Sequence, residues 1–265
     1  MSIRVIVAGA TGWAGGAVAR AVLQDNRFSL VGAVGRRHAG QDLGEVLGQG
    51  PVGLTVSASL AEALTVPADV LVDYTHPVCV KDHVLEALAA GTQVVVGTSG
   101  LNARDFIEIE QVARRSGRGV IAAGNFSLTA ALAKSFALTA ARYLNAVELV
   151  DYAAAGKADA PSGTVMELAE ALGPIIGQEA RMPSIGVPET RGGEVAGVTV
   201  HAVRLPGYVL AFEVLFGQPD ERLVIRHEAG SSAAPYVAGT LLAVERVLCV
   251  TGLVRGLDRL LFPAG

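Results

Sequence analysis

A nine-residue stretch in the middle of the chain combines a cation, a tight turn and the start of a helix. The stretch runs Gly156-Lys157-Ala158-Asp159-Ala160-Pro161-Ser162-Gly163-Thr164, and residues 165–172 continue it with helical spacing. A turn is expected because Asp bonds its own backbone and Pro fixes φ. Ser162 or Thr164 can cap the helix, whose first N–H groups would then seat a carboxylate facing Lys157. Taken alone, the stretch fits a capped helix behind a solvated lysine just as simply.

A second candidate lies near the N-terminus, where glycines recur between an expected strand and an expected helix. Residues 3–8 form a β-branched run typical of a buried parallel strand, and a helix is expected over 16–25. Between them stands Gly9-Ala10-Thr11-Gly12-Trp13-Ala14-Gly15. Such a loop lets a pyrophosphate approach the backbone at the start of the helix. In this context we predict dinucleotide binding rather than a plain tight turn.

The end of the next expected strand indicates which dinucleotide binds. Residues 28–34 are followed by Gly35-Arg36-Arg37-His38, where an NAD site would usually carry an Asp or Glu for the ribose. Arg36 and Arg37 could instead hold a 2′-phosphate through bidentate hydrogen bonds. We therefore expect NADPH as the cofactor. NADH stays possible, and the two arginines could also be ordinary loop cations.

Strands and helices alternate through the first half of the chain, which predicts a Rossmann-type doubly wound parallel sheet. In such α/β sheets, ligands lie at the loops after the carboxyl ends of the strands. Those loops are expected at 9–15, 35–37, 73–77, 97–100 and 124–127.

The pattern changes after residue 127. An alanine-rich helix over 128–144 is followed by a strand over 147–152 and, later, by alternating segments at 198–205, 209–216 and 222–227. We predict a smaller α+β domain over 127–236 with an open mixed sheet. The dinucleotide-binding domain would comprise 1–126 and 237–265, with an apolar helix over 237–251 packing back on it. An open sheet face needs a cover, so self-association through it is expected.

Composition narrows the class of protein. Of 265 residues, 51% are hydrophobic and 17% charged, and a net charge of −4 argues against a nucleic-acid partner. Two cysteines provide neither a metal site nor a disulfide framework. Neither a signal peptide nor an apolar run of the ~18 residues that a membrane span needs is visible. We expect a cytoplasmic protein that holds no metal.

Taken together, these residues resemble the dihydrodipicolinate reductase family over nearly the whole chain. The similarity rests on eight pieces in the family's order, namely 9–12, 73–77, 97–100, 125–127, 157–164, 201–207, 213–217 and 225–227.

The resemblance implies roles for particular residues. Gly9 to Gly15 would hold the pyrophosphate. The nicotinamide would be positioned by Tyr74, Thr75, Gly97, Thr98, Ser99, Asn125 and Phe126. Ser162, Gly163 and Thr164 would hold a substrate carboxylate, and Lys157 would assist proton delivery. The resemblance also implies a homotetramer joined through the second-domain sheet.

The chain departs from the family where the family's proposed general acid stands. Ala153 and Ala154 occupy the positions of the usual His-His pair, Phe212 replaces another histidine, and Ser232-Ala233 replaces Ser-Arg. Tyr152 could supply the missing proton, although a packed aromatic explains it as well. His201 and His227 lie on expected strands, where a histidine is more often structural than catalytic.

The sequence therefore predicts an NAD(P)H-dependent reductase that transfers hydride to a C=N bond or conjugated imine of a small carboxylated substrate. Two substrates stay open, the lysine-pathway heterocycle and a different cyclic imine or imino acid. A non-catalytic NADPH-binding sensor is the alternative of another class, which the missing histidines favour and the retained Lys157 disfavours.

Overall fold

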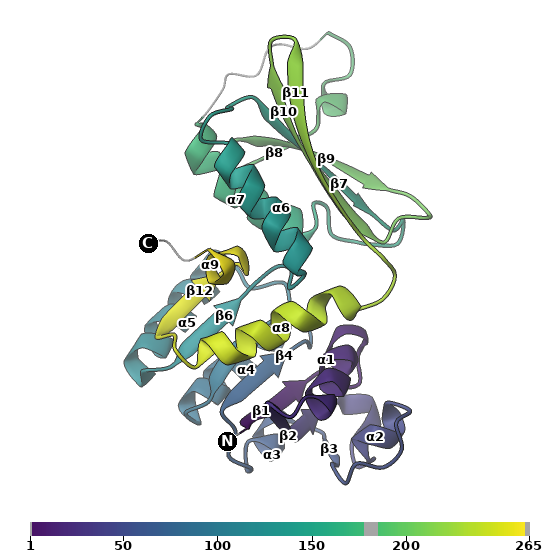
Figure 1. Ribbon diagram of the computed structural model, residues 1–265, viewed down its shortest axis with the longest axis vertical. Coiled ribbons are helices and arrows are strands. Elements are labelled where there is room, and N and C mark those ends of the chain that lie inside the picture. The colour runs from purple at the N-terminus through teal and green to yellow at the C-terminus, as the bar shows by residue number, and fades with distance from the viewer. Residues whose placement is uncertain (1, 178–184, 263–265) are drawn as a thin grey trace. The chain divides into compact units, whose positions relative to one another are not determined.

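The structure, a computed structural model, describes residues 2–177 and 185–262 (Figure 1). It divides into two compact units, one comprising residues 1–128 with 233–265 and the other residues 129–232. Each unit has its own sheet and its own apolar core. The second unit is thus a continuous segment inserted into the chain of the first.

The first unit is built on a seven-stranded sheet in which every pairing is parallel. Its central strands are short apolar runs with both faces buried, as strands covered on two sides must be. In spatial order the strands are β12 (Gly252–Arg255), β6 (Gly119–Ala122), β5 (Gln93–Val96), β4 (Val70–Asp73), β1 (Ile3–Ala8), β2 (Phe28–Val34) and β3 (Val56–Ser57).

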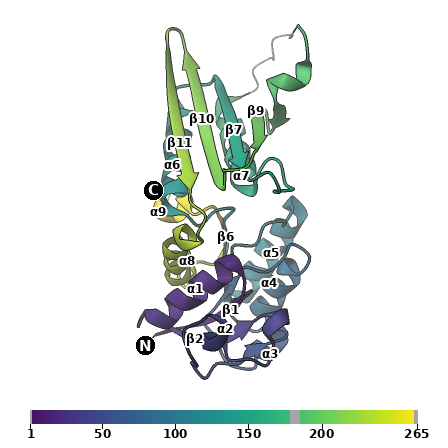
Figure 2. The ribbon, with the colours of Figure 1, turned by 90° about the vertical axis from the view of Figure 1, so that its right-hand side faces the viewer.

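Helices cover both faces of this sheet (Figure 2). On one face α1 (Trp13–Gln24) packs against α8 (Ala234–Val247), and on the other α4 (Val80–Ala89) packs against α5 (Ala103–Ser116). Shorter helices complete the unit, namely α2 (Leu43–Val46), α3 (Leu60–Ala63), α9 (Asp258–Leu261) and the 3₁₀ turn η1 (Arg36–His38). The predicted doubly wound fold is confirmed, and the chain reverses its winding between β1 and β4, where such sheets bind ligands.

Helix α5 shows how local sequence sets an element's ends. Asn102 accepts hydrogen bonds from the first amides of the helix, and the Asp105 carboxylate accepts one from the Asn102 N–H, which completes a capping box. Gly117 ends the helix in the left-handed region, with φ of 64°. The residues at its two ends therefore set where the helix begins and where it ends.

The helix expected over 237–251 is displaced in the structure. Helix α8 begins at Ala234 and ends at Val247, and Gly252 then opens β12 with φ of 90°. Residues 247–250 are apolar and therefore continue the helical pattern of α8 in the sequence. Strand β12 is only four residues long, which is too short to be predicted from its pattern.

The second unit has a five-stranded mixed sheet. Its spatial order is β11 (Glu221–Ala229), β10 (Leu210–Gln218), β7 (Val147–Ala153), β9 (Val198–Arg204) and β8 (Gly193–Val195). Strands β7 and β9 run parallel and the other pairs antiparallel. The predicted open mixed sheet is confirmed. A second 3₁₀ turn, η2 (Pro188–Arg191), precedes β8.

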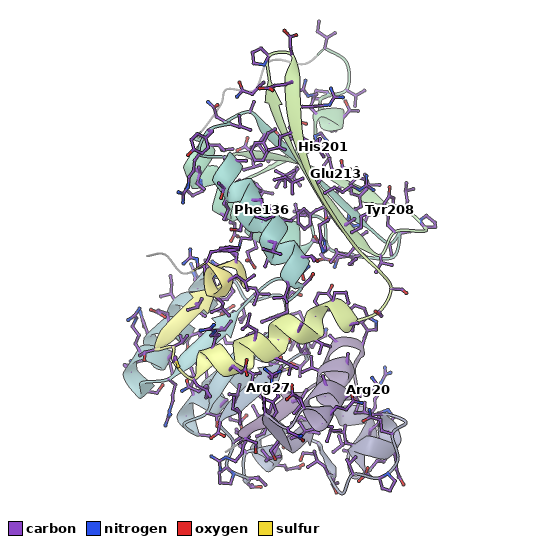
Figure 3. The ribbon with its side chains drawn as sticks, viewed as in Figure 1. Arg20, Arg27, Phe136, His201, Tyr208 and Glu213 are labelled. Atoms are coloured by element: carbon purple, nitrogen blue, oxygen red, sulfur yellow. The ribbon has the colours of Figure 1, made fainter. Side chains whose placement is uncertain are left out.

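Helices α6 (Leu128–Ala140) and α7 (Gly163–Ile176) lie on one face of this sheet (Figure 1). Their alanines and leucines pack with Leu149, Phe212 and Phe216 from the strands. Alternate strand residues therefore point to the other face, which carries Tyr152, His201 and Glu213. Figure 3 labels His201 and Glu213. We call this surface, with Arg226 of β11 added, the open face.

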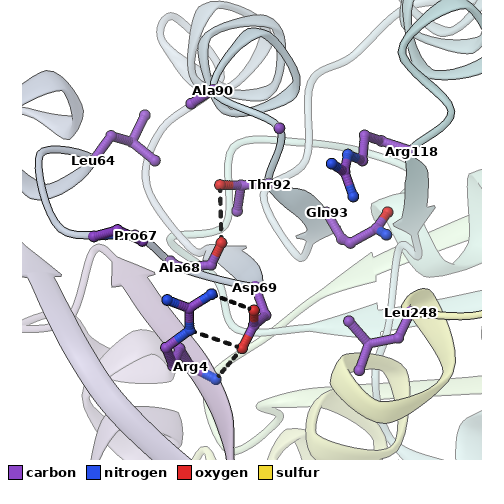
Figure 4. A pocket seen from close by; sticks show the side chains of 11 residues that line it. Arg4, Leu64, Pro67, Ala68, Asp69, Ala90, Thr92, Gln93, Arg118 and Leu248 are labelled. Carbon is purple, nitrogen blue, oxygen red and sulfur yellow. Dashed lines mark hydrogen bonds and ion pairs between the residues drawn. The ribbon is translucent and has the colours of Figure 1, made fainter.

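A cavity of about 320 Å³ opens at the amino ends of the parallel strands (Figure 4). Its lining includes Arg4 at the start of β1, Gln93 at the start of β5 and Arg118 just before β6. Arg4 is held there by a bidentate bond to Asp69. The cavity thus lies at the opposite end of the strands from the predicted cofactor loops.

Candidate active site

The glycine loop joins β1 directly to α1. Gly9 and Ala10 both donate to the Val34 carbonyl, at 2.9 and 3.1 Å, which ties the loop to the end of β2. Gly12 is the residue before α1. Because glycine has no side chain, no side chain caps the first turn of the helix at this position. Because the first N–H groups of a helix have no carbonyl partner within it, this turn presents donors to an anion.

Two of these glycines are required by close backbone approach. Gly9 has φ of 79°, and a Cβ there would lie 2.1 Å from the Tyr74 carbonyl oxygen. A Cβ on Gly15 would lie 2.2 Å from the Gly9 carbonyl oxygen. The helix start, the loop and the end of β4 are therefore in contact, as a dinucleotide pyrophosphate site requires. The cradle fits the predicted cofactor.

Trp13 opens helix α1, and the residue is 56% exposed. It makes an edge-on contact with Tyr236 of α8, with ring centroids 5.6 Å apart. Arg36 and Arg37 form η1 immediately after β2, and both are exposed. Both arginines therefore lie at the strand end where a 2′-phosphate was expected, and neither makes an ion pair within residues 2–177 and 185–262.

The loops after β4 and β5 meet at Asp73, whose side chain is fully buried. Its Oδ1 accepts hydrogen bonds from the Thr75 amide at 3.0 Å, the Thr75 hydroxyl at 2.7 Å and the Thr98 hydroxyl at 2.6 Å. The Thr75 amide also donates to the Thr98 hydroxyl oxygen at 2.8 Å. The Asp73 carboxyl group thus fixes both loops. Ser99, the residue after Thr98, is exposed.

Tyr74 lies inside the first unit. Its hydroxyl is 2.7 Å from the Thr240 hydroxyl of α8, and burial raises the pKa of Tyr74 well above its ordinary value. A Cβ on Gly97 would fall within 2.1 Å of the Tyr74 ring, so Gly97 makes room for that ring. Phe126 packs edge-on against it, and Asn125 accepts the Ser127 amide at 2.8 Å. Tyr74 and Phe126 therefore support the loops from within.

The residues expected to bind a substrate carboxylate, Ser162 to Thr164, stand at the start of helix α7 in the second unit. Ser162 holds the capping position, but its hydroxyl makes no capping bond. It donates to Asp151 Oδ1 at 2.8 Å, and its amide donates to Asp151 Oδ2 at 2.7 Å. Ser162 thus stands at an expected capping position without a capping hydrogen bond from its side chain, because the buried carboxyl group on β7 accepts from both its hydroxyl and its amide. Gly163 and Thr164 are half-buried and supply the next two amides.

Asp151 also binds Arg204 of β9. The two side chains meet at 2.8 Å with 16% of the Arg204 side chain exposed and none of Asp151. Arg204 reaches further and donates to the Asp159 carbonyl at 2.7 Å. This guanidinium therefore joins strand β7, strand β9 and the loop that carries the predicted lysine.

Lys157 follows a turn in which its amide donates to the Ala154 carbonyl at 3.0 Å. Its ammonium lies 2.6 Å from Asp159 Oδ1, and 34% of its side chain is exposed. Burial acts to raise the pKa of Asp159, but the hydrogen bond and charge of Lys157 outweigh it and lower that pKa. The structure thus brings Lys157 and the α7 start onto one loop, with the lysine at the surface.

Tyr152 lies on the open face, away from these residues. Its hydroxyl donates to Glu213 at 3.2 Å, Tyr208 stacks on its ring with centroids 5.0 Å apart, and Arg226 lies over it at 5.5 Å. Its neighbour Asp151 points to the other face, toward Ser162. The structure therefore does not bring Tyr152 together with Ser162 to Thr164. The catalytic role of Tyr152 stays a prediction.

The positions that depart from the family pattern have ordinary structural surroundings. Ala153 is buried and Ala154 is exposed. Phe212 stacks on His227 with centroids 5.4 Å apart, and His227 lies 3.0 Å from the Thr129 hydroxyl. Burial lowers the pKa of His227. His201 binds Glu148 at 2.8 Å on the open face.

The sequence reasoning missed Asp151 and Arg204. A signal was present, since a charged residue inside an apolar strand needs a buried partner. Within the described part of the chain no group of three or more His, Cys, Asp or Glu side chains could hold a metal. Likewise, none of the described helices has the length and apolar character that crossing a membrane requires.

A doubly wound sheet with a glycine loop at the switch point, joined to a second unit with an open mixed sheet, is typical of nicotinamide-dependent oxidoreductases. Two family models match the chain, "Dihydrodipicolinate reductase, N-terminus" over residues 3–126 and "Dihydrodipicolinate reductase, C-terminus" over residues 127–261. The chain belongs to the dihydrodipicolinate reductase family, whose reductases use NAD(P)H.

Individual relatives agree with this assignment. The chain is 38% identical to the 4-hydroxy-tetrahydrodipicolinate reductase of Synechococcus elongatus over 98% of both chains, and 38% identical to that of Desulfitobacterium hafniense with the same coverage. A dipicolinate-bound dihydrodipicolinate reductase from Paenisporosarcina is similar in structure, with a TM-score of 0.79, 27% identity and coverage of 98% and 99%. An amine dehydrogenase from Mycobacterium smegmatis shares the fold, with a TM-score of 0.68 and 18% identity.

Proposed function

We propose that the protein uses NADPH to reduce a C=N bond or conjugated imine in a small carboxylated substrate of the lysine pathway. This proposal rests on one observation. A chain of this family contains both the glycine loop at 9–15 and the 157–164 stretch. The names of the relatives and the dipicolinate bound to the Paenisporosarcina enzyme support a dicarboxylated heterocycle as the substrate.

In this proposal the cofactor contacts all come from loops of the first unit. The amides after Gly9 and around Gly12 would hold the pyrophosphate, and Arg36 and Arg37 would hold the 2′-phosphate. The nicotinamide would lie against Thr75, Thr98 and their neighbours Gly97, Ser99 and Asn125, with Tyr74 and Phe126 behind them. The exposure of both arginines after β2 supports NADPH over NADH.

The substrate contacts would come from the second unit. A bound reduced nicotinamide supplies hydride to the substrate carbon. The Gly163 and Thr164 amides would orient a carboxylate, while Ser162 positions them through Asp151. Lys157 would place its charge beside the developing anion and donate the proton that forms the new N–H bond, while the hydride forms the new C–H bond. Asp159 would hold the ammonium in place.

A second candidate is a reductase of a different cyclic imine, and Ala153 and Ala154 favour it. Two imidazoles can donate protons and bind a carboxylate, whereas two methyl groups can do neither. A site that lacks polar partners discriminates against the substrate that needs them. The simplest substrate for such a site carries one carboxylate and an imine carbon that accepts hydride directly.

We further propose that the open face joins four copies of the chain and that the enzyme works in the cytoplasm. Tyr152, Tyr208 and Arg226 give that face a stacked aromatic and cationic surface, which is a composition typical of interfaces. The oligomeric state can be measured by sedimentation.

Substrate turnover tests the proposal. Purified protein is assayed with NADPH and either the lysine-pathway heterocycle or a panel of monocarboxylated cyclic imines. Lys157→Met should lower kcat by ~10²–10⁴-fold. Lys81→Met is the matched control, because Lys81 also forms ion pairs and has 34% of its side chain exposed. Equal turnover by Lys157→Met and wild type would refute the role of Lys157.

Cofactor binding is measured separately from turnover. The chain has a single tryptophan, Trp13, and it opens the helix that follows the glycine loop. Its fluorescence should fall as NADPH binds. Replacing Arg36 and Arg37 with alanine should weaken NADPH much more than NADH, and an equal effect on both cofactors would exclude 2′-phosphate recognition.

A further inference from the structure

His83 lies on α4, behind the two loops that Asp73 fixes. Its Nδ1 is 2.7 Å from Asp73 Oδ2, the carboxyl oxygen opposite the one that serves Thr75 and Thr98. Only 17% of the His83 side chain is exposed. The hydrogen bond that His83 donates to Asp73 raises the pKa of His83, whereas burial lowers it, and the charges of Asp73, Glu86 and Asp82 raise it further.

A carboxylate with no exposed surface needs compensation, and His83 supplies it. Removing the imidazole would leave Oδ2 of Asp73 buried without its hydrogen-bond partner, which is costly unless the carboxyl group turns to find another. Oδ1 of Asp73 receives three hydrogen bonds, so a turn of the carboxyl group would disturb Thr75 and Thr98 together.

We propose that His83 is a positioning residue for the nicotinamide, acting through Asp73 on the 73–77 and 97–100 loops. This inference rests on the proposed function for the cofactor but concerns His83, which neither the family pattern nor the sequence reasoning singled out. His83 touches the loops through Asp73, so its removal changes their geometry without removing a cofactor contact.

The packing of α4 separates this role from a general structural one. Val80, Val84, Ala87 and Leu88 are fully buried in the core of the first unit and hold the helix against the sheet. Losing the His83 imidazole should therefore leave α4 in place. The loops should loosen, and the global stability should fall only by what the contact between His83 and Asp73 contributes.

The experiment compares His83→Leu, His83→Gln and Glu86→Gln in the full chain. The first readout, made without cofactor, is hydrogen exchange over residues 73–77 and 97–100, where the Thr75 amide bonds both Asp73 and Thr98. The second is the NADPH dissociation constant by calorimetry, with kcat and KM for NADPH measured alongside.

His83→Leu should speed exchange in both loops and raise the dissociation constant and KM for NADPH roughly 10- to 100-fold, as loss of a supporting shell does. His83→Gln, which still donates to Asp73, should recover most of the binding. Glu86→Gln removes a nearby charge and no loop bond, so it should bind NADPH like wild type.

Unchanged loop exchange and unchanged NADPH binding in His83→Leu would overturn the inference. So would a loss of melting temperature in His83→Leu large enough to account for its weaker binding, with no recovery in His83→Gln. If His83→Leu loosens both loops but the wild type binds no NADPH, the coupling stands and the proposed function fails.

Discussion

Replacing Gly15 with alanine is expected to disturb the cofactor cradle by direct collision. The new Cβ would lie 2.2 Å from the Gly9 carbonyl oxygen and 2.8 Å from the Gly9 carbonyl carbon. Both are backbone atoms and cannot rotate away. Restoring van der Waals contact at ~3.4 Å requires the helix or the loop to move by about 1 Å.

The neighbouring glycine provides a matched control. A Cβ on Gly16 would lie 3.4 Å from the Ala10 carbonyl oxygen and from a Leu47 methyl group, which is ordinary contact. Both substitutions gain about 0.5–1 kcal/mol because alanine favours a helix over glycine. Only Gly15→Ala also suffers the collision, which costs about 1–3 kcal/mol. The difference between the two variants therefore measures the collision alone.

The assay combines urea unfolding with NADPH calorimetry. Gly16→Ala should be as stable as wild type or slightly more so, and should bind NADPH normally. Gly15→Ala should be about 1–3 kcal/mol less stable than Gly16→Ala and should bind NADPH at least about tenfold more weakly, equivalent to ~1.4 kcal/mol. Equal stability and equal binding in the two variants would refute the close approach between the helix start and Gly9.

Four further results are expected. Arg204→Met would leave Asp151 buried without a cation, so the free energy of unfolding of the second unit should fall by about 3–5 kcal/mol in urea denaturation, and a loss below 1 kcal/mol would contradict the buried pair. Tyr152→Phe should keep wild-type kcat and lose about 0.5–1.5 kcal/mol of stability, whereas a large fall in kcat would support the predicted proton donor. The pKa of His83 is raised above 6.5 in the folded state, so protonated His83 stabilises the fold fully below pH 6.5. This stabilisation is lost as the pH rises through the raised pKa. The difference in stability between wild type and His83→Gln should therefore shrink above pH 6.5. The effect of pH on stability has the opposite sign for His227. Its pKa is lowered in the folded state, so protonation below pH 6.5 favours unfolding. Denaturation of His227→Gln at several pH values would test this.

The Rossmann-type half could be predicted because its signals are local. Residues 3–8 are β-branched, and the glycine spacing that follows them is set by contacts within a few residues and with the next strand. Strand β12 gave no such signal, because four residues after an apolar helix end carry too little pattern. Its pairing with β6 depends on a tertiary contact between distant parts of the chain.

The second unit shows where sequence reasoning stops. Lys157 and the turn at 159–162 were recognised from their residue types. The fate of the Ser162 hydroxyl was not, because its partner Asp151 reaches it only after β7 and α7 have packed together. The Arg204 contact likewise spans 53 positions and depends on the register of β7 with β9. Registers between strands of a mixed sheet cannot be read from one sequence.

The insertion of the second unit into the first has a consequence for synthesis. Residues 129–232 emerge from the ribosome as one piece and can fold as soon as they are complete. The first unit must wait, because α8 covers one face of its sheet and β12 pairs with the edge of β6. Until those last residues are made, the nascent chain exposes an apolar sheet face and an unpaired strand edge, which is the interval when a chaperone would be needed most.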